Sequence, residues 1–573
     1  MWPVVSTRTR QAAKIDDLSH LMTHIDWVVM FAWLTVLVSY GLYRGRGSDT
    51  VNQFLLAGKT MPWYAMGLSI MATQASAITF ISTTGQSYVD GMRFVQFYFG
   101  LPIAMVILSA TAVPIFHRAN VYTAYEYLEQ RFDAKTRALV TVVFLISRGL
   151  QAGLALSAPA IVLSVILGWP FRVTILIMGS LVVLFTTMGG IKAVTWADVQ
   201  QMIVILIALV LALIVAVHLM PGSISFLDAV RLAGAAGKLN AVTTTFDWDD
   251  RYNIWSGLLG GMFLALAYFG CDQSQVQRYL TGKSIAQSRL SLLFNAMAKV
   301  PVQFFILFLG AMVFVLFIFE KPPVLFHPVE LKQIQASPEY PRLQRQYDEE
   351  FDARRAAALK FTAAKDDASR NAAAAKFQSA QDDLDATRAR AITLAGDNDT
   401  NYIFLSFVTH YLPVGVVGLV IGVIFSAAMS AISGEINSLA TVTVIDIYKR
   451  HFHREATDRH YLIASRLATA FWGIYAAGFA SIARGFGALI EAVNQVGSLF
   501  YGGLLGVFVL AFFVKRVNGT GAFYGVLAGE AAIFAAAKFT NIAVLWYNVV
   551  GCLVVIAVAL LVSGRSTSAG RPA

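Results

Sequence analysis

The sequence predicts an all-α integral membrane protein. Its 573 residues are 57% hydrophobic and only 14% charged, a composition that water-soluble globular proteins do not normally carry. Long apolar runs recur along the chain, and each has about the 20 residues that a helix needs to cross a bilayer. Spanning β-strands are shorter and alternate apolar with polar residues, which these runs do not. The predicted fold is therefore a bundle of transmembrane helices.

About 13 runs are long enough to be spanning helices. They start near residues 24, 62, 92, 137, 172, 197, 254, 290, 414, 461, 486, 520 and 541. Lys and Arg are concentrated in the short loops that follow the odd-numbered runs, and loops of this kind lie in the cytoplasm. We therefore expect a multi-pass protein of the cell membrane, specifically the bacterial inner membrane, with its N-terminus outside and its C-terminus in the cytoplasm.

The runs also divide the chain into segments outside the central bundle. These are an extracytoplasmic tail (1–23), a leading helix with a cytoplasmic loop (24–61), an external loop (220–253), two C-terminal helices (515–563) and a cytoplasmic tail (564–573). Residues 321–401 break the apolar pattern with Ala, Lys, Arg, Asp and Glu, which is the composition of a solvated helix or helical hairpin with i, i+4 ion pairs. We expect this insertion to lie outside the membrane, either with no role in transport or as a coiled-coil surface.

Two of the predicted spans are interrupted. Residues 62–86, PWYAMGLSIMATQASAITFISTTGQ, are too polar for a helix that faces lipid, and their hydroxyls can bond carbonyls freed by a local break. A helix packed tightly through small residues is the alternative. The seventh span, GGMFLALAYFGCDQSQVQRYL, has three glycines and a polar end. Each interrupted span begins a set of five, residues 62–219 and 254–514, and the two sets run in opposite orientations. This arrangement is typical of a secondary transporter with a midplane site.

Several other classes of protein are excluded by the pattern. The net charge of +10 is spread over loops and forms no single basic face, so we expect no nucleic-acid partner. Cys271 and Cys552 lie in apolar runs, which argues against a disulfide framework. The chain lacks a nucleophile with its base, a metal-spaced His or Cys cluster and a phosphate loop, so we expect no enzyme activity. No obligatory protein partner is evident.

Four motifs resemble the sodium:solute symporter family, which includes sodium/glucose, proline, iodide and sialic-acid transporters. They are FLLAGKTMPWYAMGLS, GGIKAVTWADVQQ, DQSQVQRYL and INSLATVTVIDIYKR, in the family's order, and the resemblance covers most of residues 24–540. It implies the leucine-transporter fold, an inverted five-plus-five repeat with one helix ahead and two behind. It also implies alternating access, with sodium as the coupling ion.

The resemblance implies a sodium site where the broken second span meets the ninth span. Sodium is a hard cation that prefers oxygen ligands. The matched positions are the carbonyls of Ala72, Ala75 and Ala427, the hydroxyl of Ser430 and, as a guide for released sodium, Asp198. A cap at a helix N-terminus is an alternative role for Asp198. The sequence departs from the family at Ala431, where many members have a second hydroxyl; Ser433, Ser76 or a water can substitute, or the site is weaker or coupled to protons.

The resemblance also implies gates and a solute pocket. Tyr268 matches the inner gate, Gln74 the amide that holds it, and Phe97 an outer gate. The glutamine, glutamate and asparagine of the family's galactose site are replaced by Thr79, Tyr98 and Ala265, which argues against galactose bound in that way. The polar pocket that remains suits a hydroxylated or carboxylated solute. It comprises Thr79, Gln96, Tyr98, Lys299, Asn494 and Gln495.

Charged residues inside the spans indicate function, because they are costly in a membrane. Asp198, Asp272 and Glu435 are such carboxylates. Arg148 lies within the fourth span, where it either meets an anionic substrate, reaches toward the cytoplasmic surface or pairs with an internal carboxylate. The sequence thus predicts sodium-coupled symport of a sugar, sugar acid or other carboxylate. Alternatives are a proton-coupled or sodium-independent carrier, or a membrane solute sensor, although no signalling domain follows residue 563.

Overall fold

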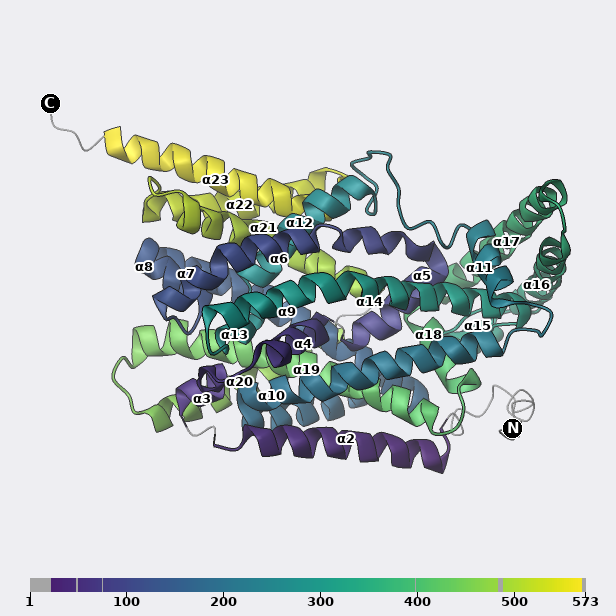
Figure 1. Ribbon diagram of the computed structural model, residues 1–573, viewed down its shortest axis with the longest axis horizontal. Helices are drawn as coiled ribbons and strands as arrows, with labels where there is room; N and C mark the ends of the chain where they lie inside the picture. The colour runs from purple at the N-terminus through teal and green to yellow at the C-terminus, as the bar shows by residue number, and fades with distance from the viewer. Residues whose placement is uncertain (1–21, 48–49, 75, 397, 483–487, 569–573) are drawn as a thin grey trace.

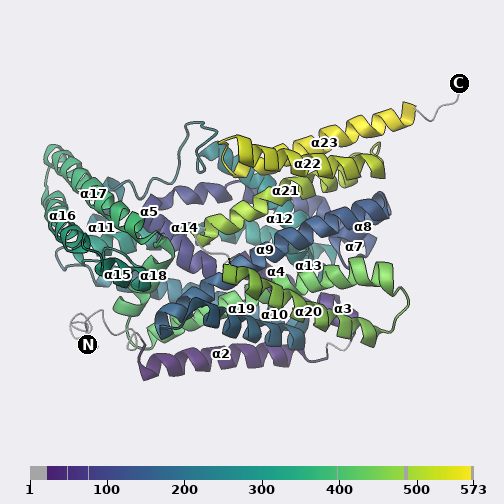
Figure 2. The same cartoon turned by 180° about the vertical axis from the view of Figure 1, so that it is seen from behind.

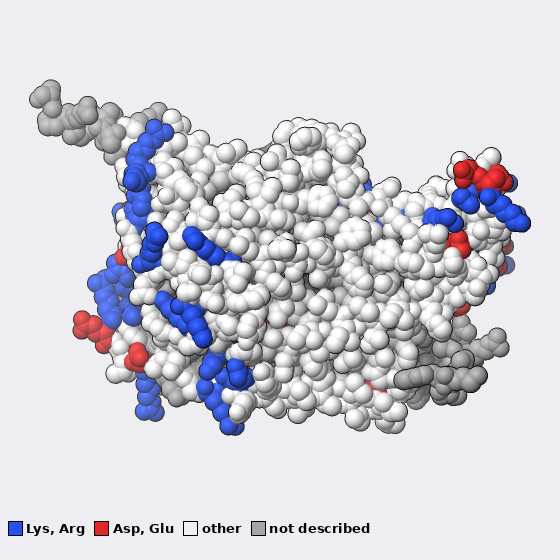
Figure 3. All heavy atoms as spheres, viewed as in Figure 1, with Lys and Arg blue, Asp and Glu red and all other residues white. Residues whose placement is uncertain are grey.

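A computed structural model describes residues 22–568 except 48–49, 75, 397 and 483–487. Within these ranges the chain is helical and contains no strand. Most of the helices run along the long axis of the molecule, and α16 and α17 project from one end of the bundle (Figures 1 and 2). Lys and Arg side chains dominate the opposite end, whereas the projecting helices carry both signs of charge (Figure 3).

The helices up to the first external loop are as follows: α2 His24–Gly45, α3 Val51–Leu56, α4 Trp63–Gln74, α5 Thr84–Asp90, α6 Leu101–Ala110, α7 Ala112–Ala119, α8 Ala124–Arg131, α9 Ala134–Leu167, α10 Phe171–His218 and α11 Phe226–Ala235. A π-helical turn, Thr79–Thr83, leads into α5, and a 3-10 stretch, Gly91–Tyr98, follows it. Helix α10 contains two spans, because Gly190 has a φ of 58° and separates Phe171–Met188 from Gly190–His218.

The remaining helices are α12 Gly261–Gly270, α13 Gln273–Leu280, α14 Ile285–Phe319, α15 Pro328–Gln335, α16 Tyr340–Ala363, α17 Asp367–Ala395, α18 Thr400–Tyr411, α19 Val416–Val442, α20 Asp458–Ile482, α21 Leu489–Phe513, α22 Gly519–Phe539 and α23 Leu545–Ser568. Short π-helical stretches lie at Ser256–Gly260, before α12, and at Thr443–Phe452, after α19.

Eleven helices among the described residues are long and apolar enough to cross a membrane, so the predicted count of thirteen is not confirmed. Two features account for the difference. The expected second span is divided into α4 and a stretch that runs on into the third span as Thr79–Ala119, and the expected seventh span is an apolar helix of only Ser256–Gly270. Both differences arise where the sequence predicted interrupted helices.

The first break lies between Gln74 and Thr79. A helix leaves its last four carbonyls without intrahelical donors, and in a membrane these need other partners. The Thr79 hydroxyl donates to the Gln74 carbonyl at 2.6 Å, and the Thr79 N–H donates to the Ser76 carbonyl at 2.9 Å. The polar residues of this span therefore stabilise a broken helix, as the sequence predicted, rather than a continuous helix packed through small residues.

The second break lies at Cys271 and Asp272, between α12 and α13. Asp272 is the N-cap of α13 and accepts a hydrogen bond from the Ser274 N–H at 2.8 Å, which satisfies one free donor of the new helix. The N–H groups of Cys271 and Asp272 both donate to the Ala267 carbonyl, which ends α12. Each set of five predicted spans therefore begins with a helix that is interrupted and capped by its own side chains.

Helix α19 lies at the centre of the bundle. Every residue in it except Val416 and Leu419 is buried, and it packs against α2, α9, α10, α13 and α20. Its first turn is held by Asp26 of α2, whose carboxylate accepts hydrogen bonds from the N–H groups of Gly415 and Gly418 at 2.6 and 3.2 Å. Side chains of α19 are thus shielded from lipid, so polar groups on it face protein or a cavity.

Residues 340–395 form the projecting pair, α16 and α17, which we call the hairpin. Two buried arginines fix its base. Arg354 donates to Gln381 across the hairpin at 3.0 Å and to the Phe317 carbonyl at the end of α14 at 2.6 Å. One terminal nitrogen of Arg388 donates to both carboxylate oxygens of Asp399, just before α18, at 2.8 and 2.9 Å. The hairpin is therefore seated firmly on the bundle.

Replacing Arg388 with Ala should loosen the hairpin, because Asp399 is left buried without its cation. Removing one partner of a buried pair costs about 3 kcal/mol or more, which corresponds to on the order of 100-fold more frequent opening. Limited proteolysis of the native protein measures that opening. Arg370→Ala, which removes a pair with the exposed Asp367 of the same hairpin, is the control and should have little effect. Equal cleavage of Arg388→Ala and wild type contradicts this role.

Candidate functional site

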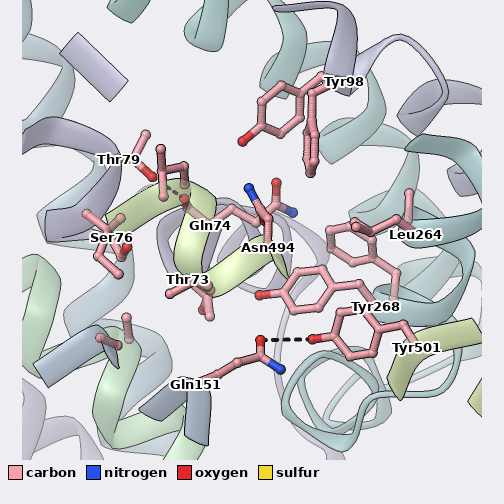
Figure 4. A pocket seen from close by; sticks show the side chains of 18 of the residues that line it. Thr73, Gln74, Ser76, Thr79, Tyr98, Gln151, Leu264, Tyr268, Asn494 and Tyr501 are labelled. Atoms are coloured by element: carbon pink, nitrogen blue, oxygen red, sulfur yellow. Dashed lines mark hydrogen bonds between the residues drawn. The ribbon is translucent and has the colours of Figure 1, made fainter. Parts of the chain in front are cut away.

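A cavity lies beside the break in α4, between α9, α12, α19 and α21 (Figure 4). Its empty volume, including the opening, is about 880 Å³. Apolar side chains such as Leu101, Leu264 and Val493 form much of the wall, and polar groups enter it from the break, from α9 and from α21. A mostly apolar pocket with a few placed polar groups is the usual form of a small-molecule site.

Asp198 forms a buried cluster next to this cavity. Its carboxylate accepts hydrogen bonds from the hydroxyls of Ser69 on α4 and Ser430 on α19, and the Arg278 guanidinium of α13 lies 3.6 Å away. The carboxylate is fully buried. Four helices therefore meet at one carboxylate. Asp198 lies about two turns into the second span of α10, so it does not cap a helix N-terminus.

The remaining predicted sodium ligands are distributed around this cluster. Ala72 lies in the last turn of α4, where carbonyls lack intrahelical donors. Ala427 lies one turn before Ser430 on α19 and is buried. Ala75 lies outside the described residues. Oxygen atoms of a carboxylate, a hydroxyl and a helix end are suitable ligands for a hard cation.

Arg148 pairs with internal carboxylates, which is one of the alternatives that the sequence left open. Its guanidinium pairs with Asp272, donates to the Glu435 carboxylate at 3.1 Å, and donates to the Tyr501 hydroxyl at 2.6 Å. The Tyr501 hydroxyl lies 3.1 Å from both Asp272 and Gln151. Arg148 lines the cavity, but the carboxylates that satisfy its charge belong to the protein.

The predicted gate residues all line the cavity. Tyr268 lies next to Tyr501, with ring centroids 6.0 Å apart, and its hydroxyl accepts a hydrogen bond from Gln275 at 2.8 Å (Figure 4). Gln74 also lines the cavity, and its side-chain amide nitrogen has no hydrogen-bond partner among the described residues. Phe97 lines both this cavity and a smaller pocket beside Arg251 and Glu491.

Four of the seven predicted substrate residues line the cavity: Thr79, Tyr98, Arg148 and Asn494. Gln495 lines the smaller pocket instead. Lys299 is fully buried with its amine 5.1 Å from the centre of the Tyr98 ring, and it does not line the cavity. Gln96 accepts a hydrogen bond from the Thr243 N–H at 2.8 Å and donates to the Tyr252 carbonyl at 2.6 Å, so it holds the loop before α12.

The structure adds residues that the sequence did not place in the sodium site, the solute pocket or the gates. Ser69 and Arg278 join the Asp198 cluster, and Gln151, Glu435 and Tyr501 line the cavity. Three of them carried a signal in the sequence: Glu435 is a charge within an apolar span, Arg278 belongs to the motif DQSQVQRYL, and Ser69 ends the motif FLLAGKTMPWYAMGLS. Tyr501 has no such signal, because tyrosine is common in membrane helices.

Two broken helices that meet a cavity deep in a helical bundle define a secondary transporter. The chain belongs to the sodium:solute symporter family, whose family model matches residues 54–337 and 381–529. The match leaves out residues 338–380, which form α16 and the first half of α17. Most of the hairpin is therefore additional to the family's common structure.

Curated relatives agree with this assignment. The chain is 28% identical over 509 residues to the human sodium-coupled monocarboxylate transporter 1, covering 88% of this chain and 72% of that protein. It is 26% identical to the sodium/sialic acid symporter NanT of Aliivibrio fischeri, covering 94% and 92%. It is 25% identical to the sodium/glucose cotransporter of Vibrio parahaemolyticus, covering 90% and 85%.

The fold is also that of a solved transporter. A structure of a Na+-coupled sialic acid symporter, in a substrate-bound outward-open state, superposes with a TM-score of 0.74 at 23% identity. The match covers 96% of this chain and 98% of that one. The protein is thus a multi-pass membrane transporter with the leucine-transporter fold that the resemblance implied.

Replacing Arg148 with Met should destabilise the protein, because Asp272 and Glu435 then share a buried site with no cation. The expected cost is about 3 kcal/mol or more, seen as a lower melting temperature in detergent. Adding Asp272→Asn to this variant should recover part of the loss. Arg231→Met, which removes an exposed pair with Asp228, is the control. A wild-type melting temperature for Arg148→Met contradicts the role of the network.

Proposed function

We propose that the protein couples inward transport of a small organic solute to sodium entry by alternating access. The observation that carries this proposal is the buried meeting of Asp198 and Ser430 beside the broken end of α4 and next to the cavity. A cation held there contacts both α4 and α19 and so favours the arrangement in which they are close. Sodium therefore stabilises one conformation in preference to the other, which is what coupling requires.

The proposed sodium ligands are the carbonyls of Ala72, Ala75 and Ala427 and the hydroxyl of Ser430. Asp198 lies behind the hydroxyl, accepts its proton in a hydrogen bond and leaves the oxygen lone pairs free for the cation. Arg278 partly balances the carboxylate from 3.6 Å. Asp198 thus acts as an electrostatic support for sodium and as a step on its way to the cytoplasm.

The proposed solute is a sugar, a sugar acid or another carboxylate, held in the cavity. Polar contacts come from Thr79, Tyr98 and Asn494, with apolar walls around them. The relatives named above transport a monocarboxylate, sialic acid and glucose, which supports this range. Lys299 reaches a solute only if the Tyr98 ring moves, since that ring lies over its amine.

We also propose roles for the aromatic residues at the two ends of the cavity. Phe97 separates the cavity from the smaller pocket beside the Arg251 and Glu491 ion pair, which suits an outer gate. Tyr268 lies on the side of Arg148 and Asp272, next to the second break, which suits an inner gate. Rearrangement of one five-helix set, 62–219 or 254–514, against the other then exposes the site to each side in turn.

The proposed orientation places the hairpin outside and the basic end in the cytoplasm of a bacterial cell. Lys and Arg dominate the end opposite the hairpin (Figure 3), and cytoplasmic loops carry that excess. Arg131 contacts the Lys515 carbonyl there, and Arg450 pairs with Glu129. The N-terminus is then outside, and α23 leads into a cytoplasmic C-terminus.

Uptake into proteoliposomes should require an inward sodium gradient for at least one solute in a panel of labelled sugars, sugar acids and monocarboxylates. Ser430→Ala removes a ligand oxygen and should raise the sodium concentration for half-maximal uptake on the order of tenfold, about 1.4 kcal/mol. The control is Ser465→Ala, a buried serine on α20 whose hydroxyl donates to the Tyr461 carbonyl. Uptake that is equal without sodium, or that follows only a proton gradient, contradicts sodium coupling and supports the alternative carrier.

A membrane-impermeant maleimide tests the orientation. Ser369→Cys on the hairpin should react in intact cells, whereas Thr457→Cys, before α20, should react only after the membrane is opened. Both positions are exposed, and the native Cys271 and Cys552 are buried. The reverse labelling pattern contradicts the proposed orientation.

A further inference from the structure

Ala431 and Glu435 lie one turn apart on the same face of α19, and both line the cavity. Side chains in an α-helix lean toward its N-terminus, so a residue covers the turn before its own. The Glu435 side chain therefore extends over the position where Ala431 lacks a hydroxyl. Ser430, which bonds Asp198, directly precedes Ala431.

One oxygen of the Glu435 carboxylate is available for a ligand. Oε1 accepts a hydrogen bond from Arg148, and Oε2 has no hydrogen-bond partner among the described residues although the side chain is only 9% exposed. Glutamine at this position can still accept the Arg148 hydrogen bond through its amide oxygen. A Glu435→Gln substitution therefore removes the unpartnered carboxylate oxygen and keeps the contact with Arg148.

The charges around Glu435 favour a cation. Arg148 carries one positive charge and pairs with two carboxylates, Asp272 and Glu435, all buried. Taken by themselves, these three groups carry one negative charge in excess. An uncompensated buried charge is costly and is balanced by an ion of opposite sign or by a proton.

Other oxygens were candidates to replace the hydroxyl absent at position 431. Ser433 is buried with an unpartnered hydroxyl, but it lies two residues after Ala431 and therefore faces a different side of α19. Ser76 lines the cavity, but it belongs to the broken segment and carries no charge. Glu435 combines a place on the same helix face, an unpartnered oxygen and an excess negative charge.

We propose that Glu435 supplies an oxygen ligand to the transported sodium ion, in place of the hydroxyl that Ala431 lacks. This inference rests on the sodium-coupled function proposed above. The sodium site then draws on two carboxylates, Asp198 behind Ser430 and Glu435 across Ala431. Because Glu435 also contacts Arg148, sodium binding is linked directly to the network that borders the solute cavity.

Sodium binding to the purified protein tests this role without knowledge of the solute. Sodium is titrated against choline at constant ionic strength, with thermal stabilisation and radiolabelled sodium binding as readouts. Glu435→Gln should weaken sodium binding at least tenfold. Adding Ala431→Ser to that variant should restore binding to within about threefold of wild type, because the hydroxyl returns. A purely structural role for Glu435 predicts no such rescue.

Glu530→Gln is the matched control, because Glu530 is another carboxylate within a membrane helix, on α22, and does not line the cavity. Wild-type sodium affinity in folded Glu435→Gln overturns the inference, as does failure of Ala431→Ser to rescue it. If Glu435→Gln does not fold, Glu435→Asp replaces it as the test variant, because it keeps the charge but withdraws the oxygen. Glu435→Asp should also weaken sodium binding, and unchanged sodium affinity of this variant overturns the inference. Absence of any sodium effect on wild type and Ser430→Ala alike overturns the proposed function itself.

Discussion

A bilayer offers no water to a bare carbonyl or to a charge, and the arrangement of this protein depends on that constraint. Both interrupted helices end in the interior of the bundle, and local side chains partner the groups that the breaks release. Thr79 bonds a carbonyl at the first break, and Asp272 caps the helix that follows the second. Backbone groups at these helix ends that have no such partner are therefore available to a ligand, and the cavity lies beside the first break.

The same lack of water requires that charged side chains inside the bundle have partners of opposite charge. Two groups of buried charges are joined by ion pairs, Arg148 with Asp272 and Glu435 in one and Arg278 with Asp198 in the other. Pairs of this kind contribute little net stability, because desolvation offsets most of the attraction. Their main effect is on position, because they connect α9, α10, α13 and α19 where a transporter must change contacts.

Much of the fold could be predicted from the sequence, because composition and apolar run length are local properties. Both breaks are marked in the same way, by the hydroxyls and amides of the second span and by the glycines and polar end of the seventh. The count of spans is less certain, since a broken helix is shorter than a bilayer and merges with its neighbour in sequence.

The site was predicted less completely, because its pairings join distant positions. The partners of Arg148 lie 124 and 287 residues further along the chain, and no spacing rule connects them. Gln96 has the character of a pocket amide but holds the loop before α12, and Lys299 lies behind Tyr98. Asp198 and Ser430 were expected near one another because both match positions of the family's sodium site. Their spacing in the sequence alone does not indicate that they are in contact.

The attachment of the hairpin to the bundle has a mechanical consequence. The hairpin contacts the second half of the first broken helix, where the Arg388 guanidinium lies over the Tyr88 ring of α5, and it is also tied to the end of α14. Helix α16 has 24 residues and is therefore about 36 Å long. Contacts continue toward the turn of the hairpin, since Phe361 and Phe377 are buried in the main hydrophobic core. The hairpin therefore has to move together with the helices on which it rests.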